Sequence, residues 1–141
     1  MEKFFVGKLI SYIQRMNQKQ LAALLKPYDI GGGGHHTYLK AILANPGINQ
    51  DQLTSEAKFD KATTARCVKQ LEEAGYVYRR IDDQDRRAYR LYPTQKAKDF
   101  EPTLRRIFEE HNRRFTSCLT EAEKEQLSSL LQKIYDSYQA D

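Results

Sequence analysis

The residues best placed to do chemistry lie in one stretch whose polar side chains follow a helical spacing. Between Asp60 and Gly75, apolar positions recur every three to four residues, the period of an amphipathic helix. The apolar face consists of Thr64, Cys67, Val68 and Leu71. The opposite face carries Ala62, Arg66 and Lys69, so it combines short side chains with positive charge. Such a face suits the major groove of DNA, which admits an α-helix, but a solvated helix surface without a partner fits it equally well.

A second cluster of charge follows this helix at residues 82–87, which read Asp-Asp-Gln-Asp-Arg-Arg. On either side, residues 76–81 and 88–92 are rich in tyrosine and aliphatic side chains, as β-strands are. The pattern predicts a β-hairpin with a polar tip, which would form a wing beside the helix. Asp85 could hold the tip in shape, although Asp85 and Arg87 could also form an ordinary solvated ion pair.

These side chains must be positioned by other helices, whose limits local signals mark. Periodicity predicts helices over Lys3–Leu25, His35–Ala44, Gln50–Lys58 and Lys61–Ala74. Asn49 and Asp60 can cap two of them, Gln52 can complete a capping box with Asn49, and Gly75 supplies a left-handed stop. The very short turn between the third and fourth helices is typical of a helix-turn-helix.

Two further helices are predicted after the hairpin. Thr94 caps one that runs to Leu119, and Pro102 should kink or restart it near residues 100–101. The last helix follows a capping box formed by Thr120 and Glu123. The first and the last two helices carry more apolar surface than a small winged domain needs, which predicts a homodimer interface.

The sequence thus predicts a mainly α fold with a small β-hairpin. We expect a single domain over residues 1–141, with a winged helix-turn-helix lobe at 30–92 and dimerisation helices at 1–29 and 93–141. A chain of 141 residues can bury a core without disulfides, and its two cysteines fit a reducing compartment.

Composition narrows the function classes. The net charge of +4 is compatible with an anionic partner but does not identify one. No apolar run is long enough to span a bilayer, and the N-terminus lacks the pattern of a signal peptide, so we expect a cytoplasmic protein with no membrane partner. No nucleophile triad, acid–base pair, phosphate loop or metal motif stands out, so we expect no enzyme, metal or cofactor.

The order of elements resembles the MarR family of bacterial and archaeal transcriptional regulators across nearly the whole chain. The matching residues are Pro46-Gly47-Ile48-x-Gln50-x-x-Leu53, Asp60-Lys61-x-Thr63, Leu71-Glu72-x-x-Gly75-Tyr76-Val77 and Arg80-x-x-Asp83-x-Asp85-Arg86-Arg87. Each motif is weak alone, whereas together, in this order and spacing, they are specific. The resemblance implies a homodimer that binds palindromic operators in double-stranded DNA, usually as a repressor, and that a small aromatic or anionic ligand releases.

The resemblance also implies roles for individual side chains. Arg87 would be the wing-tip arginine that enters the minor groove, whose negative potential attracts it, and Asp85 would orient it. Arg66 would contact a base edge and Lys69 a phosphate, while Arg86 and Arg90 would contact phosphates or remain exposed. The expected DNA-binding residues are Lys61, Ala62, Thr63, Ala65, Arg66, Lys69, Asp85, Arg86 and Arg87.

The glycine run at residues 31–34 departs from the family pattern, which has a polar-capped helix start with a threonine and a glutamine nearby. Four consecutive glycines predict a loop. The helix that follows could receive a carboxylate at its N-terminus, although a loop without a ligand explains the run as well. The candidate ligand-binding residues are Tyr12, Arg15, His35, His36, Tyr38 and Phe108.

Three alternatives stay open at this point. A zinc-responsive regulator of the same fold could use His35, His36 and His111 with Glu109 or Glu110, although no His-x-x-x-His or Cys-x-x-Cys pair is present. A redox-responsive regulator could use Cys67 or Cys118. A winged helix that only binds proteins would show no operator preference and no steep salt dependence on DNA.

Overall fold

The structure, a computed structural model, describes residues 5–32 and 34–140. It divides into two compact units, one ending at Thr103 and the other beginning at Leu104, and each is described by itself. Lys3, the predicted start of the first helix, and Gly33, within the glycine run, lie outside the described residues.

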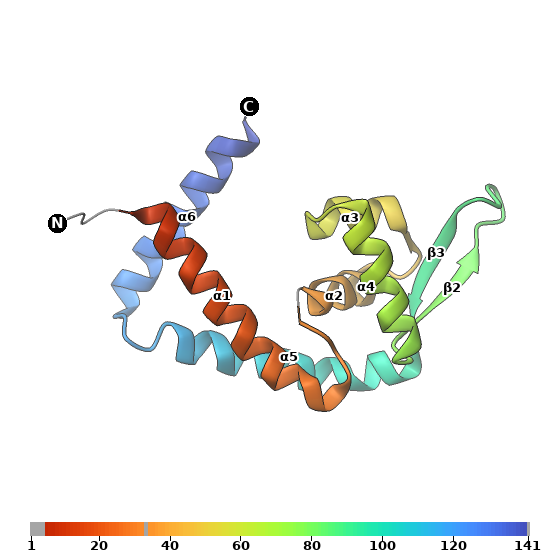
Figure 1. The fold of residues 1–141 in the computed structure, drawn as a ribbon, viewed down its shortest axis with the longest axis horizontal. Coiled ribbons are helices and arrows are strands. Elements are labelled where there is room, and N and C mark those ends of the chain that lie inside the picture. Colours follow the sequence, from red (N-terminus) through yellow and green to blue (C-terminus); the bar gives the residue numbers. More distant parts are fainter. Residues whose placement is uncertain (1–4, 33, 141) are drawn as a thin grey trace. The chain divides into compact units, whose positions relative to one another are not determined.

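The first unit contains the helix-turn-helix and the wing. Its elements in chain order are α1 (Val6–Leu25), the 3-10 helix η1 (Lys26–Tyr28), α2 (His35–Ala44), β1 (Ile48–Asn49), α3 (Gln50–Ala57), α4 (Lys61–Glu73), β2 (Val77–Ile81), β3 (Tyr89–Pro93) and the first part of α5 (Gln95–Phe115). Helices α2, α3 and α4 lie together, and β2 and β3 project from them as a hairpin (Figure 1). The predicted winged helix-turn-helix is therefore confirmed. The second unit holds the rest of α5 and α6 (Glu121–Gln139).

Local capping fixes where the central helices begin and end, as predicted. The Asn49 side chain accepts the Gln52 N–H at 2.8 Å, and the Gln52 side chain accepts the Asn49 N–H at 3.0 Å. The Asp60 carboxylate accepts the N–H of Thr63 at 2.6 Å at the start of α4. Gly75 follows α4 with φ of 84°, a left-handed conformation that glycine adopts without strain. Helices α3 and α4 each end one residue before the predicted position.

The sheet has three strands in the order β1-β3-β2, whereas the sequence predicted only the hairpin. The added strand β1 is two residues long and pairs Ile48 with Leu91 and Asn49 with Arg90. Sequence periodicity could not reveal it, because two residues show no alternation and the pairing joins segments more than forty positions apart. This strand connects the wing directly to the segment between α2 and α3.

A single apolar layer joins the three helices to the sheet. Its fully buried members are Leu39 and Ile42 of α2, Leu53 of α3, Val68 and Leu71 of α4, and Leu91 of β3. The α4 residues are those that the helical spacing placed on the apolar face. Because the same layer contacts α4 and β3, the packing holds the polar face of α4 and the wing in one frame.

The predicted limits of the first and fifth helices were also wrong. Helix α1 begins at Val6, with Phe5 at the N-cap position. Helix α5 continues through Pro102 without restarting, because one missing N–H bond is tolerated where Phe100 and Leu104 are buried on either side. It ends at Phe115 instead of Leu119, because the chain then forms turns, in which the Ser117 N–H donates to the Arg114 carbonyl oxygen and the Leu119 N–H to the Thr116 carbonyl oxygen.

Candidate DNA interface

The outer face of α4 is open to solvent along its length. Lys61, Ala62, Ala65, Arg66 and Lys69 are exposed, and Thr63 is half-buried. Thr64, Cys67, Val68 and Leu71 are buried on the opposite face. The structure therefore brings together the six helix residues expected to contact DNA, on a surface made of short side chains and cations.

The N-terminal half of α4 is anchored inward by a cluster of hydroxyl groups. Thr64 Oγ1 lies 2.9 Å from the Asp60 carbonyl oxygen, 2.9 Å from Thr54 Oγ1 of α3 and 3.1 Å from the Tyr38 hydroxyl of α2. Burial raises the pKa of Tyr38, which keeps the phenol protonated and able to donate. One threonine thus ties α4 to both of the other lobe helices.

The middle of α4 is tied to the glycine loop through an imidazole. His35 is buried at the start of α2, and its Nδ1 contacts the Gly32 carbonyl oxygen while its Nε2 contacts Oε1 of Gln70 on α4. Gly31 packs against this ring, because a Cβ added there would lie 3.2 Å from the imidazole. The glycine run is therefore joined to the helix that carries the candidate interface.

The C-terminal end of α4 is held by two cations. The Lys96 ammonium donates to the Ala74 carbonyl oxygen at 2.6 Å and lies 4.4 Å from the Tyr76 ring centroid. Arg79 of β2 bonds the Glu72 carboxylate at 2.5 Å. Cations beside the last carbonyls also interact favourably with the helix dipole, so both contacts stabilise this end.

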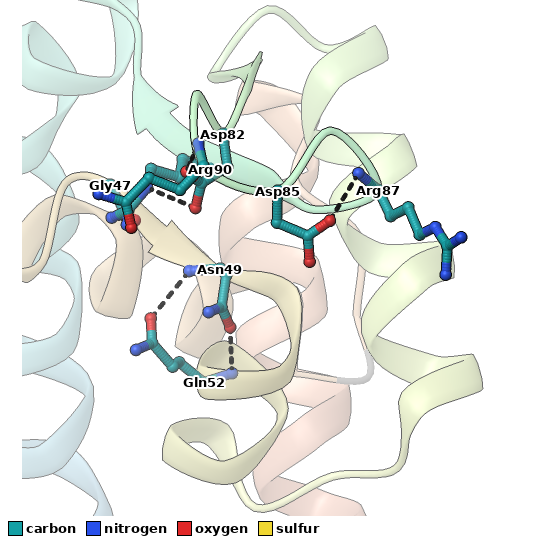
Figure 2. Close-up of polar contacts among 8 residues, drawn as sticks. Gly47, Asn49, Gln52, Asp82, Asp85, Arg87 and Arg90 are labelled. Atoms are coloured by element: carbon teal, nitrogen blue, oxygen red, sulfur yellow. Dashed lines mark hydrogen bonds and ion pairs between the residues drawn. The ribbon is translucent and has the colours of Figure 1, made fainter.

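The wing tip is shaped by Asp85. Its carboxylate accepts the backbone N–H of Arg87 at 3.0 Å, and its carbonyl oxygen accepts the N–H of Ala88 at 3.0 Å. The side chain of Arg87 points away from this carboxylate (Figure 2). Asp85 therefore orders the backbone that carries Arg87 and leaves the guanidinium open to solvent.

The charged groups of four side chains on this surface form no hydrogen bond or ion pair with any other described side chain: those of Arg66, Lys69, Arg86 and Arg87. Lys61 approaches Asp51 at 3.8 Å, but both side chains are more than four-fifths exposed, so the pair contributes little. These cations lie on the outer face of α4 and at the wing tip.

Comparisons with known proteins agree on one family. The MarR family model matches residues 34–89, which contain α2, α3, α4 and most of the wing. The HTH-type transcriptional regulator YybA of Bacillus subtilis is 37% identical over 108 residues, which cover 77% of this chain and 72% of YybA. The chain belongs to the MarR family. It is therefore a transcriptional regulator with a winged helix-turn-helix.

Solved structures share this fold over almost the whole chain. A MarR transcriptional regulator from Methanosarcina mazei is 34% identical, with a TM-score of 0.87 over 96% of this chain and 97% of that one. The MepR protein of S. aureus, solved as a complex with DNA, is 23% identical, with a TM-score of 0.86 over 96% of this chain and 99% of MepR. At that identity the second likeness shows the fold alone. No helix in the described part of this MarR chain combines the length and apolar character that a bilayer crossing requires.

The candidate ligand-binding residues are not gathered at one cavity within the first unit. A cavity of about 390 Å³ is lined by Lys26, Asp29, Ile30, Gly31, His35, Gln70 and Leu71, so His35 is the candidate that borders it. Tyr38 is buried against Thr64, whereas Tyr12 and Arg15 contact each other on α1. His36 is half-buried, and Phe108 belongs to the second unit.

The residues named for metal or redox sensing have these surroundings. Across residues 5–32 and 34–140, no three His, Cys, Asp or Glu side chains gather closely enough to hold a metal ion. Cys67 is buried against the lobe core, and burial raises the pKa of its thiol, which disfavours the reactive thiolate. Cys118 is exposed in the turn after α5.

Four residues that sequence reasoning did not use prove to organise the interface: Gln70, Arg79, Asp82 and Lys96. Arg90, expected to contact phosphate or remain exposed, is exposed, and its guanidinium also bonds Asp82 and the Gly47 carbonyl oxygen. Of these four residues, Arg79 alone had a signal in the sequence. It lies seven residues after Glu72, so this oppositely charged pair joins the end of the predicted helix to the start of the predicted strand.

Proposed function

We propose that this MarR family chain binds a palindromic operator in double-stranded DNA as a homodimer, with α4 in the major groove and the wing tip in the adjacent minor groove. The observation that carries the proposal is the set of four unpaired cations on the outer face of α4 and at the wing tip. Positive side chains without intramolecular partners favour an external anion, and their spread over a helix and a hairpin fits two neighbouring grooves.

Each expected contact has a physical basis in the exposed surface. We assign base contacts to Lys61, Ala62, Thr63, Ala65 and Arg66, on the open N-terminal half of α4. Lys69, one turn further along, is assigned to phosphate, as is Arg86. Arg87 is assigned to the minor groove, where its guanidinium can enter because Asp85 holds only the backbone.

A homodimer accounts for the apolar surface outside the lobe. Phe5, at the N-cap of α1, and Leu9 and Ile13 within α1 have exposed fractions of 47%, 54% and 44%. Helix α6 has no buried residue, yet it presents Leu127, Leu130, Leu131 and Ile134 at helical spacing. Apolar faces of this kind need a partner, so we assign residues 1–29 and 93–141 to dimerisation and residues 30–92 to DNA.

Selection of bound fragments from the source genome tests the proposal. The selected operators should contain two half-sites whose centres lie about one helical turn apart, roughly 10–10.5 bp. With two cations in each chain assigned to phosphate, Lys69 and Arg86, the dimer should show a log–log salt slope of about −4. A protein that enriches no sequence, or whose binding barely changes with salt, would refute the DNA-binding function.

Arg87→Ala tests the wing contact. Loss of one specific arginine contact costs roughly 1–3 kcal/mol, so we expect operator affinity to fall by about 5- to 150-fold in each half-site. Fluorescence anisotropy measures the affinity, and sedimentation checks that the dimer persists. Lys40→Gln, which removes one positive charge from α2, is the control. Equal affinity for wild type and Arg87→Ala would contradict the assignment.

We further propose that the protein acts as a cytoplasmic repressor that a small aromatic or anionic ligand releases. The cavity beside His35 supports this, because it borders Gln70 and Leu71 of α4 and has Lys26 at its margin. A series of benzoate-type acids, added to a preformed operator complex, should lower its anisotropy. The effector class is wrong if none of these acids releases DNA at concentrations that leave the protein folded.

A further inference from the structure

Two arginines face each other across the wing. Arg80 of β2 and Arg90 of β3 are directly paired in the antiparallel register. Like charges in this arrangement are destabilising unless each is compensated. The Arg80 guanidinium lies 5.7 Å from the ring centroids of both Tyr78 and Tyr92, which stack on each other. Arg90 is compensated differently, by a carboxylate.

That carboxylate belongs to Asp82, where the wing loop begins. Arg90 Nε donates to Asp82 Oδ2 at 3.2 Å, and Asp82 Oδ1 accepts the backbone N–H of Gln84 at 2.9 Å. The Asp82 N–H donates to the Ala88 carbonyl oxygen at 3.0 Å, which closes the loop. Only 18% of the Asp82 side chain is exposed. Asp82 is thus built into the base of the loop that carries Arg87.

The same guanidinium reaches the helix-turn-helix. Arg90 Nη1 donates to the Gly47 carbonyl oxygen at 3.2 Å (Figure 2). The Gly47 N–H donates to the Leu91 carbonyl oxygen at 2.8 Å. Gly47 has φ of 92° and immediately precedes β1, in the connection between α2 and α3. Arg90 therefore joins the base of the wing loop to the segment that leads into α3.

This bridge lies where backbone pairing to the lobe ends. Strand β1 pairs only with Leu91 and Arg90 of β3. Beyond Arg90, the wing is supported by its own hairpin, which is paired as far as Ile81 and Tyr89. Buried Leu91 and the bond between Arg79 and Glu72 also hold the base of the hairpin. The part of the wing beyond Arg90 is therefore the part that can change its angle, and a side-chain bridge at the last residue paired to β1 opposes that motion.

We infer that Asp82 and Arg90 are positioning residues that fix the wing against the helix-turn-helix, so that Arg87 meets the minor groove without further ordering. The inference rests on the proposed DNA-binding function. Its physical basis is preorganisation: a wing that is already fixed loses less conformational freedom on binding, so more of the contact energy appears as affinity.

A double-mutant cycle between Arg90 and Arg87 tests it. We expect Arg90→Gln to weaken operator binding by about tenfold. In the Arg87→Ala background, the same substitution should have less than about a twofold effect, because Arg90 acts through the contact that is already absent. Asp82→Asn should reproduce this pattern. Equal effects of Arg90→Gln in both backgrounds would overturn the inference.

Footprinting separates positioning from general damage to the fold. In Arg90→Gln, hydroxyl-radical protection of the minor groove should fall while methylation protection in the major groove persists. Arg90→Lys, which keeps the charge but lacks the guanidinium fork that reaches two acceptors, should be intermediate. Lys40→Gln is the matched control for one lost charge. A parallel loss of both protections, or no change in either, would overturn the inference, whereas a wild type without any footprint would refute the proposed function itself.

Discussion

Replacing Thr64 with valine removes one hydroxyl at the junction of three helices while keeping the shape of the side chain. Thr64 is fully buried and contacts the hydroxyls of Tyr38 and Thr54 and the carbonyl oxygen of Asp60. Each hydroxyl has one proton. Thr64 donates to Asp60, and Thr54 has Gln50 O as an acceptor at 2.9 Å, so Tyr38 donates to Thr64. The valine variant therefore leaves the Tyr38 hydroxyl buried without an acceptor.

The expected loss of stability follows from that unpaired group. A buried donor left without a partner costs about 1–3 kcal/mol, and the lost Thr64 bonds add to it, so we expect about 2 kcal/mol. For a chain of this size, each kcal/mol lowers Tm by roughly 2–4 °C. Thr64→Val should therefore unfold about 4–8 °C below wild type when both are measured at the same protomer concentration, because dimerisation also affects Tm.

A second substitution decides whether this reasoning is right. Tyr38→Phe removes the stranded hydroxyl, so adding it to Thr64→Val should raise Tm above that of the single variant. Thermal unfolding followed by circular dichroism measures all four proteins of the cycle. If Tyr38→Phe lowers Tm by the same amount in both backgrounds, the two hydroxyls are not coupled, and the hydrogen bond between them contributes no measurable free energy of folding.

Three further changes test the local structure of the lobe. Gly34→Ala should destabilise the protein by more than about 1 kcal/mol, because φ is 91° and the new Cβ would lie 2.8 Å from the Phe59 ring. Gly7→Ala, whose new Cβ would have no atom within 4 Å, should instead raise Tm. Equal effects of the two substitutions on Tm would contradict this. Asn49→Ala should lose about 1 kcal/mol in urea unfolding through its helix cap, and an unchanged midpoint would show that the cap is dispensable. Burial lowers the pKa of His36 from 6.5 to about 4, so the unfolded chain binds more protons than the folded one between these pH values. The free energy of unfolding should therefore fall as the pH drops from 6.5 to 4. If urea unfolding gives the same pH dependence for wild type and His36→Gln across this range, the shift is refuted.

Much of the lobe could be predicted from the sequence, because its signals are local. Asp60 and Asn49 accept N–H groups three residues away, so a cap needs no tertiary information. The buried face of α4 follows from helical spacing alone. Strand β1 was missed because it exists only through pairing with Leu91 and Arg90. The end of α5 was misplaced because apolar spacing continues to Leu119, whereas the backbone turns after Phe115.

The candidate interface was predictable in position but not in its internal contacts. Exposure of Arg66 follows from its place on the helix, and exposure of Arg87 from its place at a hairpin tip. The partners of Arg90 could not be read from the sequence, since Gly47 is 43 positions away and a long side chain can reach acceptors in many directions. For a related reason, the sequence could not show that Tyr38 lies away from the cavity beside His35: it is an apolar-face residue whose buried hydroxyl contacts Thr64.

The cations of the lobe therefore serve two different purposes, although they look alike in the sequence. Arg79, Arg90 and Lys96 bond protein acceptors at the end of α4 and the base of the wing, where they set the geometry of the surface. Arg66 and Arg87 lie on the outer face of α4 and at the wing tip, and neither guanidinium forms a hydrogen bond or ion pair with another described side chain. A cation bonded within the protein is held in place and has fewer free donors, so it is less able to reach a phosphate than an unbonded one. The engaged arginines contribute instead by holding the free ones in place, which is why Arg90, at the last residue paired to β1, affects the interface without belonging to it.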